Sequence, residues 1–428
     1  MRMKFNKSRQ LLLVSAVSLL AAGLMTACST ATTDFVFVAS AKAAGPNSYG
    51  EINVFEINRV SGAMRQIPTS PFPSGGRNPV AEAVSSDDAN LYVVNEDDNT
   101  IVQFMIGSDG KLYPQNTVNT PGIYPLAVAV SGSNLFVVDT YQPLSTCSNA
   151  QPCSGSVAVF PIEPASGTGS NAIASGRLGT SVANGSLTYW PLCQYGYISG
   201  TDSTQCKTGA MSASSDVITP TAVNVLVSGA SDYVFVTAYD SSITPAAGYV
   251  FGFSTGSDGA LVPLNGGVPF AAGIYPSAIA SDSSNHVYVT DSKSGDIRAY
   301  AFASGVLSEL SGSPFAAGNQ PSAIVVDPQY PFAYVANAQD GNVRAYSISS
   351  SGTLTSIGAY ATGIQPVAIG IDPSASHFLF TANFLGSNVS DFELNSTTGT
   401  LINAQHSPYT SNALPTAVAA ISHGGTAK

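Results

Sequence analysis

The pattern of apolar and polar positions is clearest over residues 321–363, where short apolar stretches alternate with turn sequences. Residues 322–326 form an apolar run that ends at an Asp-Pro pair, and residues 332–336 are aromatic and β-branched, as strands prefer. Residues 343–348 alternate apolar and polar after an Asp-Gly pair, which is typical of a tight hairpin. A Ser/Gly turn then leads into residues 354–360. The pattern predicts four strands, A to D, of one antiparallel meander.

Weaker copies of this unit fill the chain from residue 34 onward. They align on the proline that opens strand A, found at Pro79, Pro125, Pro220, Pro276, Pro321, Pro366 and Pro415. Most of these prolines are 45 to 56 residues apart, and the unit that starts at Pro125 is longer because it carries an insertion. A single four-stranded sheet cannot bury both of its faces, so the copies must pack against one another. Four-stranded units of this length predict a β-propeller.

The two ends of the chain complement each other. Residues 414–422 resemble a strand A without partners, whereas residues 35–39, 52–57 and 64–76 resemble strands B, C and D without a strand A. Joined, the two ends predict a seventh, closing blade built from both termini, and this closure leaves no sheet edge exposed. The sequence therefore predicts an all-β fold, a seven-bladed propeller of four-stranded antiparallel blades over residues 34–423, with a short tail at 424–428. An open β-solenoid is the alternative, and it leaves the complementary ends unexplained.

The first 33 residues predict export and anchoring. Residues 1–27 contain a basic segment and an apolar stretch at 11–24, as in a signal peptide. Residues 24–28 resemble a bacterial lipobox, which implies cleavage before Cys28 and lipidation of its thiol, although Met25 departs from the preferred leucine. An ordinary cleaved signal peptide is the alternative. We expect residues 28–33 to link a membrane-anchored Cys28 to a monomeric propeller in the cell envelope, where Ser29 favours the outer membrane.

Charge excludes some partners. Without residues 1–27 the chain carries 11 basic and 26 acidic residues, which argues against binding to nucleic acid or to anionic lipid. Charged residues make up only 10% of the chain and hydrophobic residues 44%. This composition suits a turn-rich β protein and not a disordered chain.

Cysteine content indicates an oxidising compartment. Besides Cys28 the chain has four cysteines, Cys147, Cys153, Cys193 and Cys206. An even number in an exported chain predicts disulfides. Three pairings are possible, and the most local one joins Cys147 to Cys153 and Cys193 to Cys206. A zinc site is the alternative, but the spacing is irregular and no histidine lies nearby in the sequence.

The insertion, at about residues 140–155 and 163–219, belongs to the third blade when the closing blade is counted first. It contains the only tryptophan, Trp190, together with Tyr189, Tyr195 and Tyr197. Long loops on a rigid scaffold often carry function, and these rings are able to stack on a sugar or hold a partner. The alternative, which we favour, is that these aromatic rings form a small hydrophobic core beneath the loop. We expect both cysteine loops to project from the face where strands A begin.

Three short motifs recur. Strand B carries YVTD at 288–291 and YVAN at 334–337, Asp-Pro follows strand A at 327–328 and 372–373, and strand D ends in SPFAAG at 313–318. These motifs are similar to those of the YVTN and lactonase-type seven-bladed propellers. The resemblance covers about residues 34–423 and implies the same fold.

Activity is harder to transfer from that family. Its lactonase members hydrolyse sugar lactones such as 6-phosphogluconolactone, and the resemblance implies histidines two residues after the strand-A proline, with arginines and a glutamate facing the channel. In this chain all seven positions are alanine: Ala81, Ala127, Ala222, Ala278, Ala323, Ala368 and Ala417. His286 and His377 instead precede strand B, where we expect solvated turn residues. A phosphorylated substrate would need clustered Arg or Lys, which the strands A lack.

Glu82 breaks a regular position. Three residues after the strand-A proline, the other six units carry valine or isoleucine. A carboxylate in this packed position predicts poor solvation near the channel and a raised pKa. Our hypothesis is that Glu82 is the catalytic base or part of a ligand site. A local bulge that turns Glu82 toward solvent is the alternative.

The ends of strands B supply a second group of candidates. They carry oxygen-bearing side chains, namely Asn95, Glu96, Asp97, Asp139, Asp240, Asp291 and Asn337. Such loops bind ligands or calcium in other proteins, but capping of hairpin turns explains most of these residues more simply. We therefore predict no metal and no cofactor.

These observations leave three functions open. The best interpretation is an exported, lipid-anchored propeller that acts as a binding or interaction scaffold at the cell envelope, with a protein or carbohydrate partner. A lactone hydrolase with a divergent site is the alternative, and a carbohydrate-binding protein that uses Trp190 is the third. The seven alanines favour the scaffold over the hydrolase.

Overall fold

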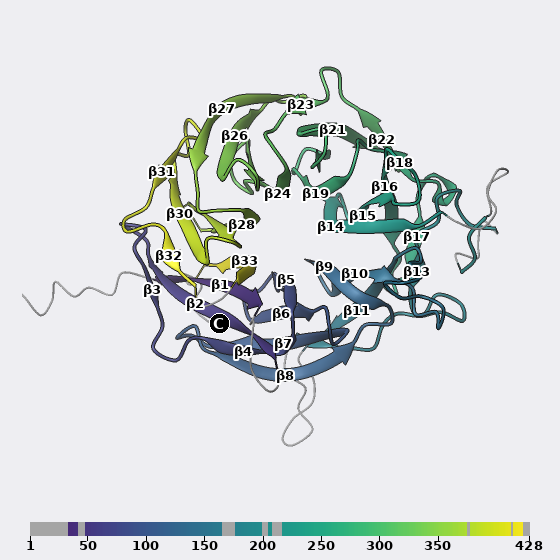
Figure 1. Cartoon of the computed structure of the whole chain (residues 1–428), viewed down its shortest axis with the longest axis horizontal. Helices are drawn as coiled ribbons and strands as arrows, with labels where there is room; N and C mark the ends of the chain where they lie inside the picture. The colour runs from purple at the N-terminus through teal and green to yellow at the C-terminus, as the bar shows by residue number, and fades with distance from the viewer. Residues whose placement is uncertain are drawn as a thin grey trace, which may run out of the picture.

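The computed structural model describes residues 33–41, 48–164, 176–198, 204–207, 216–374, 377–411 and 414–422. The predicted signal peptide, the lipidation site at Cys28 and the tail lie outside these residues. The described strands form seven antiparallel sheets arranged in a ring (Figure 1). The predicted fold, a seven-bladed β-propeller, is confirmed. Within the described ranges no helix is long and apolar enough to cross a bilayer.

Each blade places one strand A nearest the axis of the ring (Figure 1). The closing blade contains β33 (Leu414–Ile421), β1 (Thr33–Ala41), β2 (Tyr49–Asn58), β3 (Met64–Gln66) and β4 (Phe72–Arg77). The second contains β5 (Pro79–Val84), β6 (Asn90–Asn95), β7 (Thr100–Ile106) and β8 (Leu112–Asn119). The third contains β9 (Ile123–Ser131), β10 (Asn134–Tyr141), β11 (Ser156–Glu163), β12 (Arg177–Leu178) and β13 (Trp190–Pro191). The fourth contains β14 (Ile218–Ser228), β15 (Ser231–Asp240), β16 (Ala247–Thr255), β17 (Leu261–Pro263) and β18 (Phe270–Ala271).

The remaining blades continue the same up-and-down order. The fifth contains β19 (Pro276–Ser281), β20 (His286–Asp291), β21 (Asp296–Ala303), β22 (Val306–Glu309) and β23 (Phe315–Ala316). The sixth contains β24 (Pro321–Val326), β25 (Phe332–Asn337), β26 (Asn342–Ile348) and β27 (Leu354–Ala361). The seventh contains β28 (Pro366–Ile371), β29 (Phe378–Asn383), β30 (Asn388–Leu394), β31 (Leu401–Asn403) and β32 (Tyr409–Thr410).

The two ends of the chain close the ring as predicted. β33 pairs antiparallel with β1 along its length, so the last strand becomes the innermost strand of the closing blade. The Thr416 hydroxyl donates to the carbonyl of Pro79 in the second blade at 2.7 Å. The same link recurs between other neighbouring blades, from Ser277 to Pro321 and from Ser322 to Pro366, both at 2.7 Å. Innermost strands are thus tied edge to edge by hydroxyl-to-carbonyl bonds, including across the chain ends.

The tyrosine of the strand-B motif joins blades. The rings of Tyr288 and Tyr334 are fully buried between neighbouring sheets. The Tyr288 hydroxyl donates to the carbonyl of Gly352 at 3.1 Å, and Tyr334 donates to Gly399 at 3.2 Å. Each glycine lies in the C–D hairpin of the following blade. A buried phenol needs such a partner, so the motif is a packing device for the fold.

The serine of the strand-D motif fills a gap in the ladder. Strand D is broken into two pieces in five blades, for example β22 and β23. Between these pieces the Ser313 hydroxyl accepts a hydrogen bond from the Ala299 amide at 3.1 Å. Ser70 and Ser407 do the same for the amides of Val54 and Asp391, both at 2.8 Å. The hydroxyl replaces the missing strand carbonyl, which keeps the strand-C amide satisfied.

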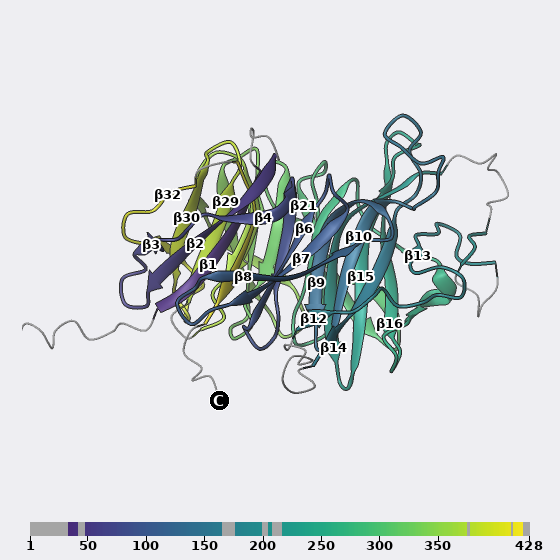
Figure 2. The same ribbon diagram turned by 90° about the horizontal axis from the view of Figure 1, so that it is seen from below.

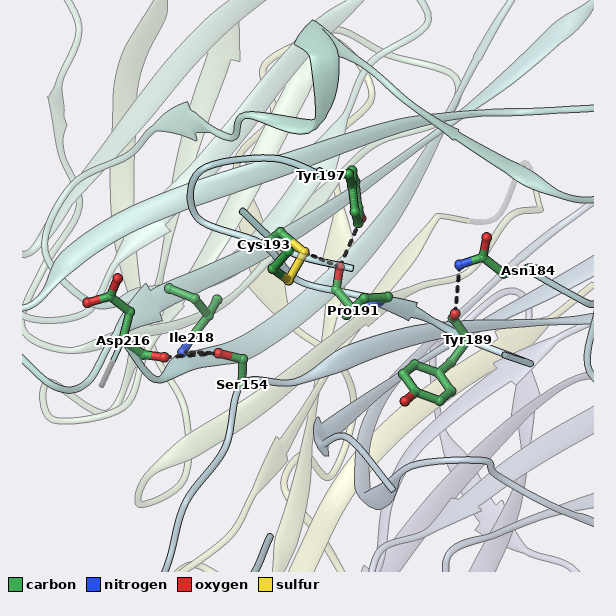
Figure 3. The surroundings of a disulfide bond; sticks show 9 residues. Ser154, Asn184, Tyr189, Pro191, Cys193, Tyr197, Asp216 and Ile218 are labelled. Carbon is green, nitrogen blue, oxygen red and sulfur yellow. Dashed lines mark hydrogen bonds between the residues drawn. A yellow bond between two sulfur atoms is a disulfide. The ribbon is translucent and has the colours of Figure 1, made fainter. Parts of the chain in front are cut away.

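The insertion is fastened by the two predicted disulfides, Cys147–Cys153 and Cys193–Cys206. Figure 2 shows it at one edge of the ring, near β13. The Ser154 hydroxyl accepts from the Ile218 amide at 3.1 Å and donates to the Asp216 carbonyl at 3.2 Å (Figure 3). The Cys147–Cys153 loop is therefore held against the start of β14.

Candidate functional site

One face of the ring carries the ends of strands B and the beginnings of strands A, and we call it the entry face. In five blades the residue before the strand-A proline has a left-handed backbone. The φ angle lies between 53° and 58° at Asn78, Tyr124, Tyr275, Gln320 and Gln365. Side-chain-bearing residues rarely adopt this conformation, least of all before proline. Because such strain persists where function needs it, the entry face is the candidate functional surface.

A polar pocket of about 600 Å³ opens on this face between the fifth and sixth blades. It is lined by Tyr275, Ser292, Lys293, Ser294, Gly295, Asn319, Gln320 and Gln339. The loops that form it brace one another, since the Ser292 amide donates to the Tyr275 carbonyl at 2.9 Å. Hydroxyl, amide and ammonium groups around one aromatic ring suit a ligand that carries hydroxyl and carbonyl groups.

A pair of carboxyl groups lies at the base of the hairpin that lines this pocket. In the sixth blade Asn337 and Asn342 face each other across the corresponding hairpin, and the Asn337 amide donates to Asn342 at 2.9 Å. In the fifth blade the same two positions are Asp291 and Asp296. Two opposed carboxylates repel each other, so this blade departs from the hydrogen-bonded amide pair of its neighbour.

The pair keeps a proton at neutral pH. Burial, then the charge of Asp296, raises the pKa of Asp291 to about 8, against a smaller lowering effect of Arg298. Neither carboxylate oxygen of Asp291 completes a hydrogen bond, although the Gly273 amide lies close enough to lower its pKa slightly and the Arg298 Nε lies 3.6 Å from Oδ2. With a proton, Asp291 is able to donate to Asp296 as Asn337 donates to Asn342. Asp296 itself is only half-buried and follows the pocket residue Gly295.

The oxygen-bearing residues predicted at the ends of strands B do not form one solvent-facing set. Four of them are fully buried and Asp240 is nearly so; the four are Asn95, Asp139, Asp291 and Asn337. Burial raises the pKa of Asp139 to about 7, although the Gly122 amide donates to it at 3.2 Å. Glu96 is half-buried and accepts from Asn78 at 2.6 Å, while Asp97 is exposed. Over the described ranges no three acidic, histidine or cysteine side chains gather as metal ligands.

Glu82 lies between two blades. Both of its carboxylate oxygens are buried and complete no hydrogen bond, although the amides of Ala39 in β1 and Ala419 in β33 lie close enough to affect its ionisation. Burial dominates and raises the pKa of Glu82 to about 8, in the direction that the sequence predicted. Its role as a base stays a prediction.

The two histidines beside strand B are buried, and the expectation of solvated turn residues is wrong. His286 is 7% exposed and its Nδ1 lies 2.7 Å from Asp282, whereas His377 is 3% exposed and its Nε2 lies 3.7 Å from Asp327. Both lie at the starts of strands B, on the face opposite the pocket. Residues of the sixth blade cover these rings: Gly352 lies against His286, and the ring of Tyr330 has its centroid 4.8 Å from that of His377. The sequence pattern does not reveal these contacts between blades.

Three aromatic residues of the insertion, Trp190, Tyr189 and Tyr197, are also buried, whereas Tyr195 is 41% exposed. Trp190 is 1% exposed in a core cluster with Val157 and Phe251, and Tyr189 is 6% exposed. The Tyr197 hydroxyl donates to the Pro191 carbonyl at 2.8 Å (Figure 3). The faces of the Trp190 ring are covered, so this structure does not support its use in stacking on a sugar.

Comparison with known proteins agrees with the geometry. Residues 286–416 match the family model described as lactonase, seven-bladed β-propeller. Over this segment, less than a third of its length, the chain is similar to the lactonase-type seven-bladed propellers. A structure described as a "putative 6-phosphogluconolactonase" from Bacteroides fragilis is 19% identical with a TM-score of 0.65, covering 92% of this chain and 99% of its own. The periplasmic gluconolactonase of Pseudomonas aeruginosa is 17% identical with a TM-score of 0.64, covering 91% and 99%. No curated protein matches this sequence.

Sequence reasoning missed part of the candidate site. Asp291 was among the predicted residues, but its partner Asp296 and the pocket residues Tyr275 and Lys293 were not. One signal was available, because the sixth-blade pair Asn337 and Asn342 aligns with Asp291 and Asp296 in the repeat. A like-charged pair at a position that tolerates amides indicates chemistry beyond folding.

Proposed function

We propose that this lactonase-like propeller hydrolyses a sugar-derived lactone in the entry-face pocket. The carboxyl pair Asp291–Asp296, at the base of a hairpin that contributes Lys293 to the pocket, carries the proposal. The names of the similar structures point to the same substrate class. Ester hydrolysis needs a base for water and a positive group for the developing oxyanion, and this hairpin offers both.

The proposed reaction uses water alone as its second substrate. Asp296 takes a proton from water while the water oxygen bonds to the lactone carbonyl carbon, and the Lys293 ammonium stabilises the resulting oxyanion. The ring C–O bond then breaks, and the leaving oxygen receives a proton from Asp296, giving the open hydroxy acid. Asp291, which keeps its own proton, supports Asp296 as a hydrogen-bond donor. Hydroxyls of the sugar bind the side chains of Asn319, Gln320 and Gln339.

A binding scaffold at the cell envelope is the second candidate. It is favoured by the alanines at all seven positions where the family resemblance implies histidine. An exported, lipid-anchored location fits either function, and it is supported by the lipobox-like residues 24–28 and by two disulfides, which persist outside reducing compartments.

The proposal is tested by hydrolysis of a panel of sugar and aliphatic lactones, followed by proton release, with the chain starting at Ser29. We expect Asp296→Asn to lower kcat/KM about 10²–10⁴-fold, because the substitution removes the base. The asparagine still accepts a hydrogen bond from protonated Asp291, so the hairpin keeps its shape.

The wild-type rate should fall as pH rises through about 8, where Asp291 loses its proton. Asp258→Asn, the same change on an exposed hairpin, is the control and should have no effect. If no lactone is hydrolysed faster than its spontaneous rate, the hydrolase proposal is wrong and the binding scaffold remains as the function.

A further inference from the structure

Four tyrosines form a second feature of the entry face, and we call them the tyrosine shelf: Tyr124, Tyr141, Tyr239 and Tyr275. The rings of Tyr239 and Tyr275 have centroids 4.6 Å apart, and those of Tyr124 and Tyr141 are 6.1 Å apart in an edge-on arrangement. Burial, together with neighbouring Tyr275 and Tyr141, raises the pKa of Tyr239. The shelf therefore consists of two tyrosine pairs on the entry face that together span the third, fourth and fifth blades.

The shelf differs from the tyrosines that hold blades together. Tyr92, Tyr288 and Tyr334 have no exposed surface and donate their hydroxyls to glycine carbonyls. All four shelf residues are half-buried, so each ring keeps an accessible part. Tyr124 and Tyr275 are also held at φ angles of 58° and 57°. A packing role alone does not require aromatic side chains on a strained backbone at a partly open surface.

Tyr275 belongs to both features, because its ring packs at a tilt against Tyr239 and also lines the polar pocket. A ligand that fills the pocket and extends past Tyr275 reaches the shelf next. Aromatic rings beside hydroxyl and amide groups match the two surfaces of a sugar ring, its apolar C–H face and its hydroxyl edge. The acidic balance of the chain, by contrast, disfavours a polyanionic ligand.

We infer that the tyrosine shelf binds further sugar rings of an oligosaccharide whose terminal, lactone-bearing unit occupies the pocket. The inference rests on the proposed function for the identity of the terminal unit. The chemical class of the substrate is then an oligosaccharide aldonolactone and not a free monosaccharide lactone. The two features bind different parts of this substrate: the pocket recognises hydroxyl and carbonyl groups of the terminal unit, and the shelf stacks against each further ring.

The test measures binding by calorimetry to the full mature chain from Ser29, using cello-, malto- and chitooligosaccharides of one to four units. In at least one series we expect Kd to fall about tenfold from the monosaccharide to the trisaccharide, a gain of the size that ring stacking provides. The double variant Tyr141→Leu/Tyr239→Leu should lose that gain and keep the monosaccharide Kd. Tyr141→Phe/Tyr239→Phe should retain the gain, because the rings remain. Tyr113→Leu, an exposed tyrosine on β8, is the matched control.

A second measurement uses the wild-type chain, so that its result does not depend on correct folding of the leucine variant. In protein with isotope-labelled tyrosine rings, trisaccharide should shift the ring resonances of the shelf, and monosaccharide should shift Tyr275 alone. Equal Kd for all chain lengths, an unchanged gain in the leucine variant, or the absence of trisaccharide-induced shifts in the shelf rings would overturn the inference. Length-dependent binding without lactone hydrolysis would support sugar binding at the shelf and contradict the proposed hydrolysis. Hydrolysis of monosaccharide lactones with binding that does not depend on length would support the hydrolysis and contradict sugar binding at the shelf.

Discussion

A chain that stops before β33, at residue 413, should fail to give a folded monomer. β33 is the innermost strand of the closing blade and hydrogen-bonds to β1 along its length. Its residues Val418 and Ile421 are buried in two separate interblade cores. Without β33 those cores open and β1 becomes an unpaired edge. Because a whole domain is stable by only about 5–15 kcal/mol, the loss of two core contacts and one ladder exceeds what the ring tolerates.

The measurement is thermal unfolding followed by circular dichroism, with the oligomeric state from size-exclusion chromatography. A chain that stops after Ser422 is the control and should melt like the full chain, since it keeps β33. Thr416→Val is the graded case, because it removes the bond to Pro79 and should cost about 1 kcal/mol. A cooperative, monomeric melt of the chain ending at 413, at the temperature of the full chain, would show that closure does not hold the ring.

Replacing Glu82 with isoleucine, the residue found at this position in three other units, should stabilise the fold by about 3 kcal/mol at pH 7. The pKa of Glu82 is raised from 4.5 to about 8 by burial, so folding favours the protonated side chain. Its favourable contribution is complete below pH 4.5 and is lost as the pH rises toward about 8. Above that pH the folded protein holds a buried, ionised carboxylate without hydrogen bonds.

Urea unfolding at pH 4.5, 6, 7 and 8 measures this effect as a difference between variants, since Asp139 and Asp291 also have raised pKa values. Glu82→Gln should remove the same pH dependence while leaving a buried polar group. Glu393→Gln, an exposed glutamate on β30, is the matched control. A stability difference between wild type and Glu82→Gln that is constant with pH would contradict the buried carboxylate. A parallel loss of lactone hydrolysis in Glu82→Gln would instead support its predicted role as a base.

The sequence alone determined the blades, their number and their closure. These follow from local features: strand alternation, Asp-Gly and Asp-Pro turns, and the proline at the start of each strand A. The same unit repeats, so one clear copy at residues 321–363 explained weaker ones, and complementary ends at β1 and β33 predicted the closing blade. For the cysteines the sequence left three pairings open, and the structure contains the most local one, Cys147–Cys153 with Cys193–Cys206.

Only the tertiary structure decided where side chains lie between blades. Glu82 and Trp190 both occupy short strands, yet the carboxylate is enclosed by the closing blade and the indole by the core of the third and fourth blades. The tyrosine shelf joins residues from three blades, from Tyr124 to Tyr275, more than a hundred positions apart in sequence. Strand periodicity reports which face of its own sheet a residue occupies. Which neighbour covers that face depends on how the blades pack, and this packing created both the pocket and the shelf.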